Sequence, residues 1–114
     1  MAVDYDPRAV EVTCRNLERN GVDGISVHEA DVLKWRSRRR FEVVAANLFA
    51  GVLCGAMPMM MRVLRPEGRL IVSGILADQW ESTREVAERA GLEVACDRKR
   101  GKWVSALLLR TGDL

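Results

Sequence analysis

Apolar residues recur every three or four residues in some segments of this chain and form short continuous runs in others. These two patterns predict where its helices and strands lie. Spacings of three and four residues indicate helices. The first predicted helix starts at Asp6-Pro7, since Asp can cap a helix and Pro suits its first turn. It ends at Asn20-Gly21, because Gly accepts the left-handed conformation of a helix stop. Its expected buried stripe is Val10, Cys14 and Leu17.

Two further segments have helical spacing. The first is rich in Met and is expected to begin or bend near Pro58. Its Met cluster at 57–61 predicts adaptable packing, or residues left partly bare. The other helix runs from about Asp78 to Ala90 and stops at Gly91. Its expected inner stripe is Trp80, Thr83, Ala87 and Ala90.

Short apolar runs predict strands at 25–28, 41–46, 69–73, 92–97 and 103–109, and the opening run Ala2-Val3 predicts a further, shorter strand. The run at 41–46 is mostly apolar, which is typical of a central strand in a covered parallel sheet. Turns are predicted at 65–68 and 98–101, and the second makes a hairpin of the last two strands. This order predicts an α/β fold with a mostly parallel sheet that ends in an antiparallel hairpin. No linker is visible, so residues 1–114 are expected to form one domain.

Composition narrows the class of protein. The 114 residues include 18 basic and 16 acidic side chains, a net charge of +2, and 48% are apolar, as in an ordinary globular domain. No run approaches the ~18 apolar residues of a membrane span, and no secretory start is present, so we expect a cytoplasmic protein.

Cys14, Cys54 and Cys96 are expected to be reduced core thiols. Trp80 and Trp103 are expected in the core and Trp35 partly exposed.

Two acids follow predicted strands, at the edge where open parallel sheets bind ligands. Asp4 can accept hydrogen bonds from both hydroxyls of a ribose, or can be a solvated acid beside the capping Asp6. Asp31 can accept a bond from an adenine amino group, with Val32 and Leu33 against the ring. The alternative for Asp31 is an acid on a surface loop.

An amide follows the strand at 41–46. Asn47 can hold an incoming amine by its lone pair or N–H, although an isolated Asn is more often a turn residue. The single His28 is expected to be a strand residue rather than a base. Neither a metal-ligand cluster nor a Ser-His-Asp arrangement is apparent in the sequence.

Several stretches occur in an order typical of one enzyme family: Val3-Asp4-Tyr5-Asp6-Pro7, Asn20-Gly21-Val22, Ala30-Asp31-Val32-Leu33, Val44-Ala45-Ala46-Asn47-Leu48, Leu64-Arg65-Pro66-Glu67-Gly68-Arg69-Leu70 and Ser73-Gly74-Ile75-Leu76. By these stretches the chain resembles class I S-adenosylmethionine-dependent methyltransferases, and more narrowly the ribosomal protein L11 methyltransferase family. The resemblance runs from Ala2 to about Arg110. The Asn-Leu-x-Ala and Ser-Gly-Ile-Leu stretches favour this family over methyltransferases in general.

The resemblance implies a three-layer Rossmann-like fold and N-methylation of amino groups of a ribosomal protein, with S-adenosylmethionine as cofactor. It implies that Asp4 binds the ribose hydroxyls, that Asp31 and Val32 bind the adenine, and that Asn47 faces the substrate amine as the catalytic residue. Methyl transfer from a sulfonium needs orientation and a neutral amine more than strong acid-base catalysis, which suits a site with one polar amide.

Compared with that family, the chain begins directly at the ribose acid. We therefore expect a truncated domain, without the N-terminal recognition domain and the glycine-rich first strand, loop and helix. This places independent methyl transfer by the chain in doubt.

Two alternative functions depend on other residues. One is a non-catalytic module that binds ribosomal RNA or protein through two basic segments, Arg36 to Arg40 and Arg98 to Arg100. The other is a remnant that dimerises by pairing exposed sheet edges with a second copy. Salt-sensitive RNA affinity would favour the first, and a concentration-dependent mass the second.

Overall fold

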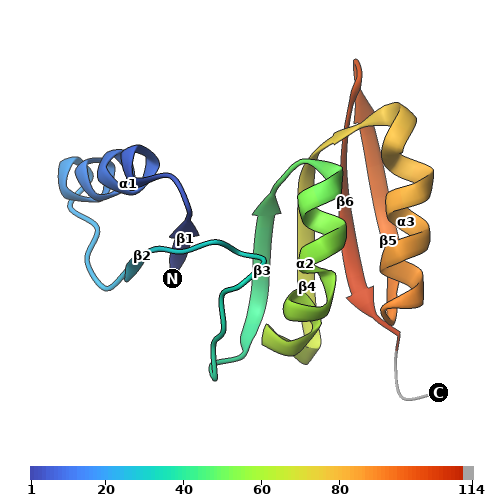
Figure 1. The fold of residues 1–114 in the computed structure, drawn as a ribbon, viewed down its shortest axis with the longest axis horizontal. Helices are drawn as coiled ribbons and strands as arrows, with labels where there is room; N and C mark the ends of the chain where they lie inside the picture. Colours follow the sequence, from blue (N-terminus) through green and yellow to red (C-terminus); the bar gives the residue numbers. More distant parts are fainter. Residues whose placement is uncertain (112–114) are drawn as a thin grey trace. The chain divides into compact units, whose positions relative to one another are not determined.

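A short parallel pair of strands with one helix makes up the first of two compact units, Met1–Arg36. The second unit is Ser37–Leu114, and the computed structural model describes residues 1–111 (Figure 1). Each unit has its own sheet. The prediction of a single domain stays a prediction.

The first unit contains β1 (Ala2–Asp4), α1 (Pro7–Arg19) and β2 (Val27–Glu29). The strands β1 and β2 pair in parallel. As predicted, Asp6 caps α1, accepting a hydrogen bond from the backbone N–H of Arg8 at 2.9 Å. The helix ends where Gly21 adopts a φ of 62°.

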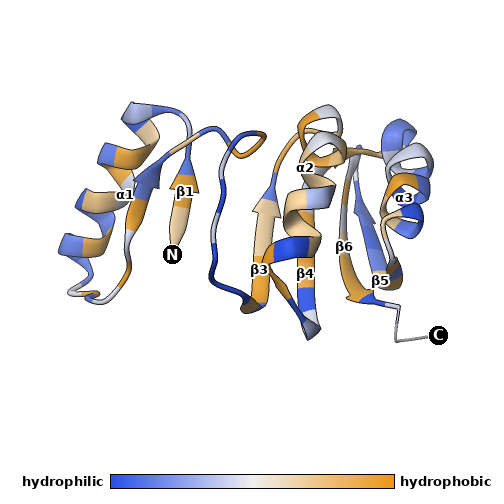
Figure 2. Ribbon diagram, turned by 60° about the horizontal axis from the view of Figure 1, so that its bottom comes forward, coloured by the Kyte–Doolittle hydropathy of each residue, from blue (hydrophilic) through white to orange (hydrophobic). Residues whose placement is uncertain are grey.

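The predicted buried stripe of α1 is wrong. Polar and apolar residues alternate along the helix (Figure 2), yet none of its residues is buried. Val10 and Leu17 are half-buried and Cys14 is exposed. The reason is that the strands of this unit have three residues each and offer the helix little apolar surface.

The second unit follows the order β3 (Phe41–Asn47), α2 (Ala50–Val63), β4 (Leu64–Leu76), the 3-10 turn η1 (Ala77–Gln79), α3 (Trp80–Arg89), β5 (Leu92–Arg100) and β6 (Trp103–Arg110). Its sheet has the strand order β3-β4-β6-β5. The pair β3–β4 is parallel, whereas β6 runs antiparallel to both β4 and β5. Parallel pairs and a final antiparallel hairpin are therefore confirmed.

The core of the second unit lies between one face of the sheet and the helices α2 and α3 (Figure 1). Alternate residues are buried there in the middle of β4, at Gly68, Leu70 and Val72, and along β6, at Val104, Ala106 and Leu108. From α2, Leu53, Met57, Met59 and Met60 are buried, so these Met residues pack in the core as predicted. Pro58 lies inside this helix rather than at its start. Thr83 and Ala87 of α3 are buried as predicted.

Trp80 is the polar anchor of this core. It is buried as predicted, and its indole Nε1–H donates to Asp97 of β5 at 2.9 Å. The bond joins α3 to the edge strand of the sheet, so the only polar atom of the indole is satisfied.

The opposite face of the sheet is open within residues 1–111, so the prediction of a central, covered strand at 41–46 is wrong. β3 lies at an edge of the sheet, and Val43 is 58% exposed. Ile71 of β4 is 44% exposed on the same face. Trp103 of β6 is 41% exposed, which corrects its expected place in the core.

Two predicted turns are also wrong in detail. Residues 65–68 lie within β4, although its pairing with β3 jumps from Leu64 to Arg69 there. Residues 98–100 continue β5, and the hairpin turns at Gly101 instead, where φ is 61°. The basic run continues the strand because Arg98, Lys99 and Arg100 each have a pairing partner in β6.

The cysteines are free, as predicted, but they do not lie in the core. Cys14 and Cys96 are exposed and Cys54 is half-buried. Trp35 is half-buried, as expected. Each helix within residues 1–111 is too short or too polar to cross a membrane.

Candidate functional site

Asp4 occupies the carboxyl end of β1, and short backbone contacts hold it in place. Its Oδ1 accepts a hydrogen bond from the backbone N–H of Asp6 at 3.0 Å. Its carbonyl oxygen accepts one from the N–H of Ala30 at 2.9 Å, which ties it to the residue that follows β2. The side chain is exposed.

Asp31 has the same local arrangement after β2. Its Oδ1 accepts a hydrogen bond from the N–H of Leu33 at 3.0 Å. Its carbonyl oxygen closes a turn by accepting bonds from Lys34 at 2.9 Å and Trp35 at 2.8 Å. Because Ala30 is bonded to Asp4, the structure brings the two predicted acids to the same end of the β1–β2 sheet.

The two carboxylates share a useful chemical feature. In each, Oδ1 is occupied by the backbone N–H two residues ahead, which fixes the plane of the group. Within residues 1–111, Oδ2 of neither group accepts a hydrogen bond from the protein. Each carboxylate therefore presents one free oxygen, with two lone pairs, to ligand donors such as hydroxyl or amino groups. Beside Asp31, Val32 is half-buried and Leu33 is 46% exposed.

Asn47 lies in the second unit, so the structure describes it apart from Asp4 and Asp31. It is the last residue of β3 and pairs with Ser73 of β4, whose carbonyl accepts the N–H of Leu48 at 3.2 Å. The side chain is exposed, at the carboxyl end of a parallel strand as predicted.

Gly74 is the residue that makes room for the Asn47 side chain. A Cβ built at position 74 would overlap the amide oxygen of Asn47. Gly74 also has a φ of 81°, a conformation that side chains strongly disfavour. The sequence motif contained this glycine, but the strand pattern did not show that it lies under the amide.

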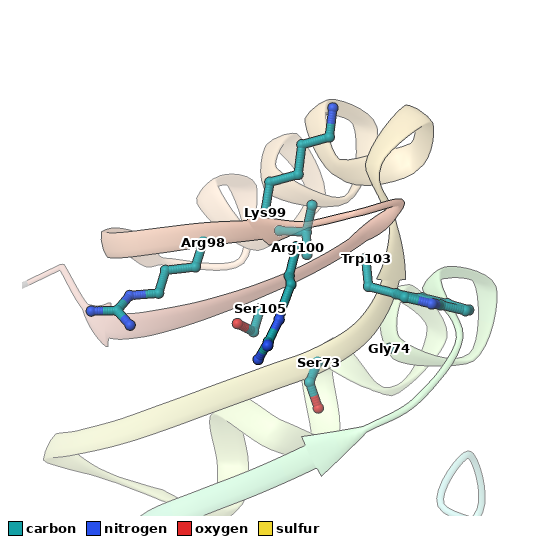
Figure 3. A pocket seen from close by; sticks show the side chains of 8 residues that line it. Ser73, Gly74, Arg98, Lys99, Arg100, Trp103 and Ser105 are labelled. Atoms are coloured by element: carbon teal, nitrogen blue, oxygen red, sulfur yellow. The ribbon is translucent and has the colours of Figure 1, made fainter.

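Beside this point lies an open hollow of about 360 Å³ on the second unit (Figure 3). It is bordered by residues at the ends of β4, β5 and β6: Ser73, Gly74, Arg98, Lys99, Arg100, Trp103, Val104 and Ser105. Sequence reasoning placed Trp103 in the core and missed this hollow. The alternation of Val104, Ser105 and Ala106 was the available signal, because it marks one open and one covered face.

The two basic segments do not form one surface on the second unit. Arg38, Arg39 and Arg40 precede Phe41, which pairs with Leu64 at one end of the sheet, and Arg39 lies over the Phe41 ring at 5.4 Å. The hollow adjoins Ser73, which pairs with Asn47 at the other end of β3. A strand of this length spans about 20 Å. Arg36 belongs to the first unit.

No group of three or more His, Cys, Asp or Glu within residues 1–111 could hold a metal ion. His28 is exposed in β2, in agreement with its expected place in a strand.

Comparison with known proteins gives a consistent result along the chain. The family model described as ribosomal protein L11 methyltransferase (PrmA) matches residues 1–111. A ribosomal protein L11 methyltransferase of Streptococcus thermophilus (strain CNRZ 1066) is 34% identical over 99% of this chain, and one of Streptococcus pneumoniae (strain P1031) is 35% identical over the same share. In both cases the chain spans 36% of the relative, about a third of its length.

Solved structures share the fold. A ribosomal protein L11 methylase from Lactobacillus delbrueckii subsp. bulgaricus superimposes with a TM-score of 0.90 at 21% identity, over 96% of this chain and 56% of that one. The N-methyltransferase NodS from Bradyrhizobium japonicum WM9, solved with S-adenosyl-L-homocysteine, gives a TM-score of 0.76 at 19% identity, over 95% and 64%. These likenesses confirm the predicted Rossmann-like methyltransferase fold.

Proposed function

The chain belongs to the ribosomal protein L11 methyltransferase family, and we propose that it forms part of an enzyme that transfers a methyl group from S-adenosylmethionine to an amino group of a ribosomal protein. We place this reaction in the cytoplasm. The observation that carries the proposal is the pair of acids at one end of the β1–β2 sheet, each with a free carboxylate oxygen.

These acids fit the adenosine part of the cofactor. The ribose offers two hydroxyl donors and the adenine offers an amino donor, and an ionised carboxylate only accepts hydrogen bonds. In the proposed site Asp4 accepts the ribose hydroxyls and Asp31 accepts the adenine amino group. The half-buried Val32 supplies an apolar contact to the ring. The bonds to Asp6 and Leu33 hold both carboxylates ready, which lowers the entropy lost on binding.

In this proposal Asn47 binds and orients the substrate amine. When bound, the cofactor supplies a methyl group activated on a positively charged sulfur. In the proposed site the amide oxygen of Asn47 accepts an N–H of the incoming amine. The nitrogen lone pair then points away from Asn47 and is free to attack the methyl group. An amide does not remove a proton at neutral pH, so the amine has to arrive neutral or lose its proton to water. The role of Asn47 is therefore orientation rather than base catalysis.

Calorimetric titration of the chain with S-adenosylmethionine, and in parallel with S-adenosylhomocysteine, tests cofactor binding. We expect saturable binding that weakens about tenfold or more in Asp4→Ala and in Asp31→Ala, since hydrogen bonds to charged groups contribute about 1.5–3 kcal/mol. Asp23→Ala is the matched control, because Asp23 is an exposed acid of the same unit. An affinity unchanged in Asp4→Ala removes Asp4 from the site, and no binding by the folded chain contradicts the proposal.

Measuring cofactor affinity and methyl incorporation on one variant separates the role of Asn47 from cofactor binding. Asn47→Ala is expected to bind S-adenosylmethionine with unchanged affinity and to lose methyl incorporation into ribosomal protein L11, measured with radiolabelled cofactor. Asn20→Ala is the control for an exposed Asn outside the site. Incorporation by Asn47→Ala that equals a measurable incorporation by the parent chain would contradict the assignment of Asn47.

A further inference from the structure

The hollow beside Ser73 and Gly74 carries positive charge that nothing in the described structure neutralises. Four of the five residues from Arg98 to Lys102 are basic, and none of the residues that border the hollow is acidic. Within residues 1–111, neither Arg98 nor Arg100 takes part in an ion pair, since the ion pairs there are those of Arg15 and Arg84.

The strand geometry gathers hydrogen-bond donors on one side. Arg98 lies opposite Ser105 in the β5–β6 pairing, and Arg98 and Arg100 share a face because side chains alternate along a strand. Figure 3 shows Arg100 reaching toward the side where the hydroxyls of Ser105 and Ser73 lie, whereas Lys99 points the other way. Two guanidinium groups and two hydroxyls therefore border the same hollow.

Asp97, the acidic residue nearest in sequence to these arginines, does not border the hollow. Asp97 accepts the indole N–H of Trp80 on the helix-covered side of the sheet. Its charge consequently lies on the opposite face from Arg98 and Arg100. The arginines thus offer their full charge and their forked donors to an outside anion.

An aromatic ring completes the border. Trp103 is 41% exposed, and the ammonium of Lys102 lies 5.3 Å from the centre of its ring. A surface that combines an exposed aromatic ring with several cationic side chains is typical of single-stranded nucleic-acid binding, since bases stack on the ring while the cations hold the phosphates.

From these observations we propose that the hollow binds a single-stranded nucleic acid, with Arg98 and Arg100 on consecutive phosphates and one base stacked on Trp103. Guanidinium forks match phosphate oxygens, and the hydroxyls of Ser73 and Ser105 supply further donors. An acidic peptide would use the charges but would leave the Trp103 ring without a partner. This binding does not rest on the proposed methyl transfer.

The test is fluorescence anisotropy of a labelled twelve-nucleotide oligouridylate, titrated with the chain at several salt concentrations. We expect Arg98→Gln with Arg100→Gln to weaken binding about tenfold or more. The slope of log affinity against log salt should become shallower by about 1.4, since each phosphate contact to a single strand contributes about 0.7. Trp103→Leu should weaken binding with an unchanged slope, because stacking releases no counterions.

Three comparisons decide the location and the class of ligand. Arg62→Gln with Arg89→Gln removes the same charge from exposed helix positions and is expected to change the affinity little. The proposal is overturned if this control weakens binding equally, or if Arg38→Gln with Arg40→Gln abolishes binding while the Arg98 and Arg100 variant binds normally. It is also overturned if polyglutamate displaces the RNA at equal concentration, which would make the hollow a site for acidic proteins. Binding of the matching DNA strand as tightly as RNA supports recognition of the phosphates alone, whereas tighter RNA binding supports an added contact to the ribose.

Discussion

Replacing Gly74 by Ala tests the arrangement on which the proposed role of Asn47 depends. The new methyl group would overlap the amide oxygen of Asn47, and the backbone at position 74 has a φ of 81°. Both effects destabilise the second unit, but only the overlap reaches Asn47. Gly101→Ala is the matched control, because Gly101 also has a positive φ, of 61°, and a Cβ there would meet nothing within 4 Å.

The two effects have separable magnitudes. Placing an L side chain in the left-handed region costs about 1–2 kcal/mol, and both variants pay this cost. Overpacking adds about 1–3 kcal/mol in Gly74→Ala alone. We therefore expect Gly74→Ala to lower the free energy of unfolding by about 2–5 kcal/mol, and Gly101→Ala by about 1–2 kcal/mol.

Urea denaturation followed by far-ultraviolet circular dichroism measures these changes. A second prediction of the same geometry is that Asn47→Ala restores about 1 kcal/mol or more in the Gly74→Ala background, because it removes the overlapping amide. Equal losses for Gly74→Ala and Gly101→Ala, with no restoration in the double variant, would refute the packing of Asn47 over Gly74.

Two further predictions concern the second unit. Asp97→Ala should lower the free energy of unfolding by about 1–3 kcal/mol, measured in urea, because it leaves the buried indole N–H of Trp80 without an acceptor, whereas Asp97→Asn keeps an acceptor and should cost less. The alternative of pairing through exposed sheet edges predicts a mass that rises with concentration in sedimentation equilibrium, and it predicts that Val43→Lys on the edge strand β3 returns the chain to a monomer. A constant mass across the concentration range would contradict that pairing.

Local chemistry explains which parts of the fold were predictable. The start of α1 at Asp6-Pro7 depends on a cap and a first-turn proline, and the end of α3 on Gly91, so both could be predicted from neighbouring residues. The elements whose prediction failed depend on packing partners. The run at 41–46 is apolar enough for a central strand, but its place at a sheet edge is decided by which strands exist to flank it.

The last two strands show the same limit. The basic run at 98–100 looks like a turn by composition, yet it continues β5 because β6 pairs with it along its whole length. The register of β6 with β4 and β5 turns Trp103 toward the open face of the sheet, so hydrophobicity alone placed it wrongly in the core. Both outcomes follow from strand pairing, which composition does not report.

The residues of the candidate site show the same difference between local and long-range determinants. Asp4 and Asp31 are each oriented by the backbone N–H two residues ahead, so their geometry is contained in segments of three residues. Asn47 instead depends on Gly74, which is remote in sequence and comes beneath the amide only because β3 and β4 pair in parallel. The carboxylates should therefore keep their orientation when the sheet of the second unit is perturbed, whereas the amide should not. Substitutions that loosen β3–β4 pairing are thus expected to impair the handling of the amine before they weaken the affinity for the cofactor.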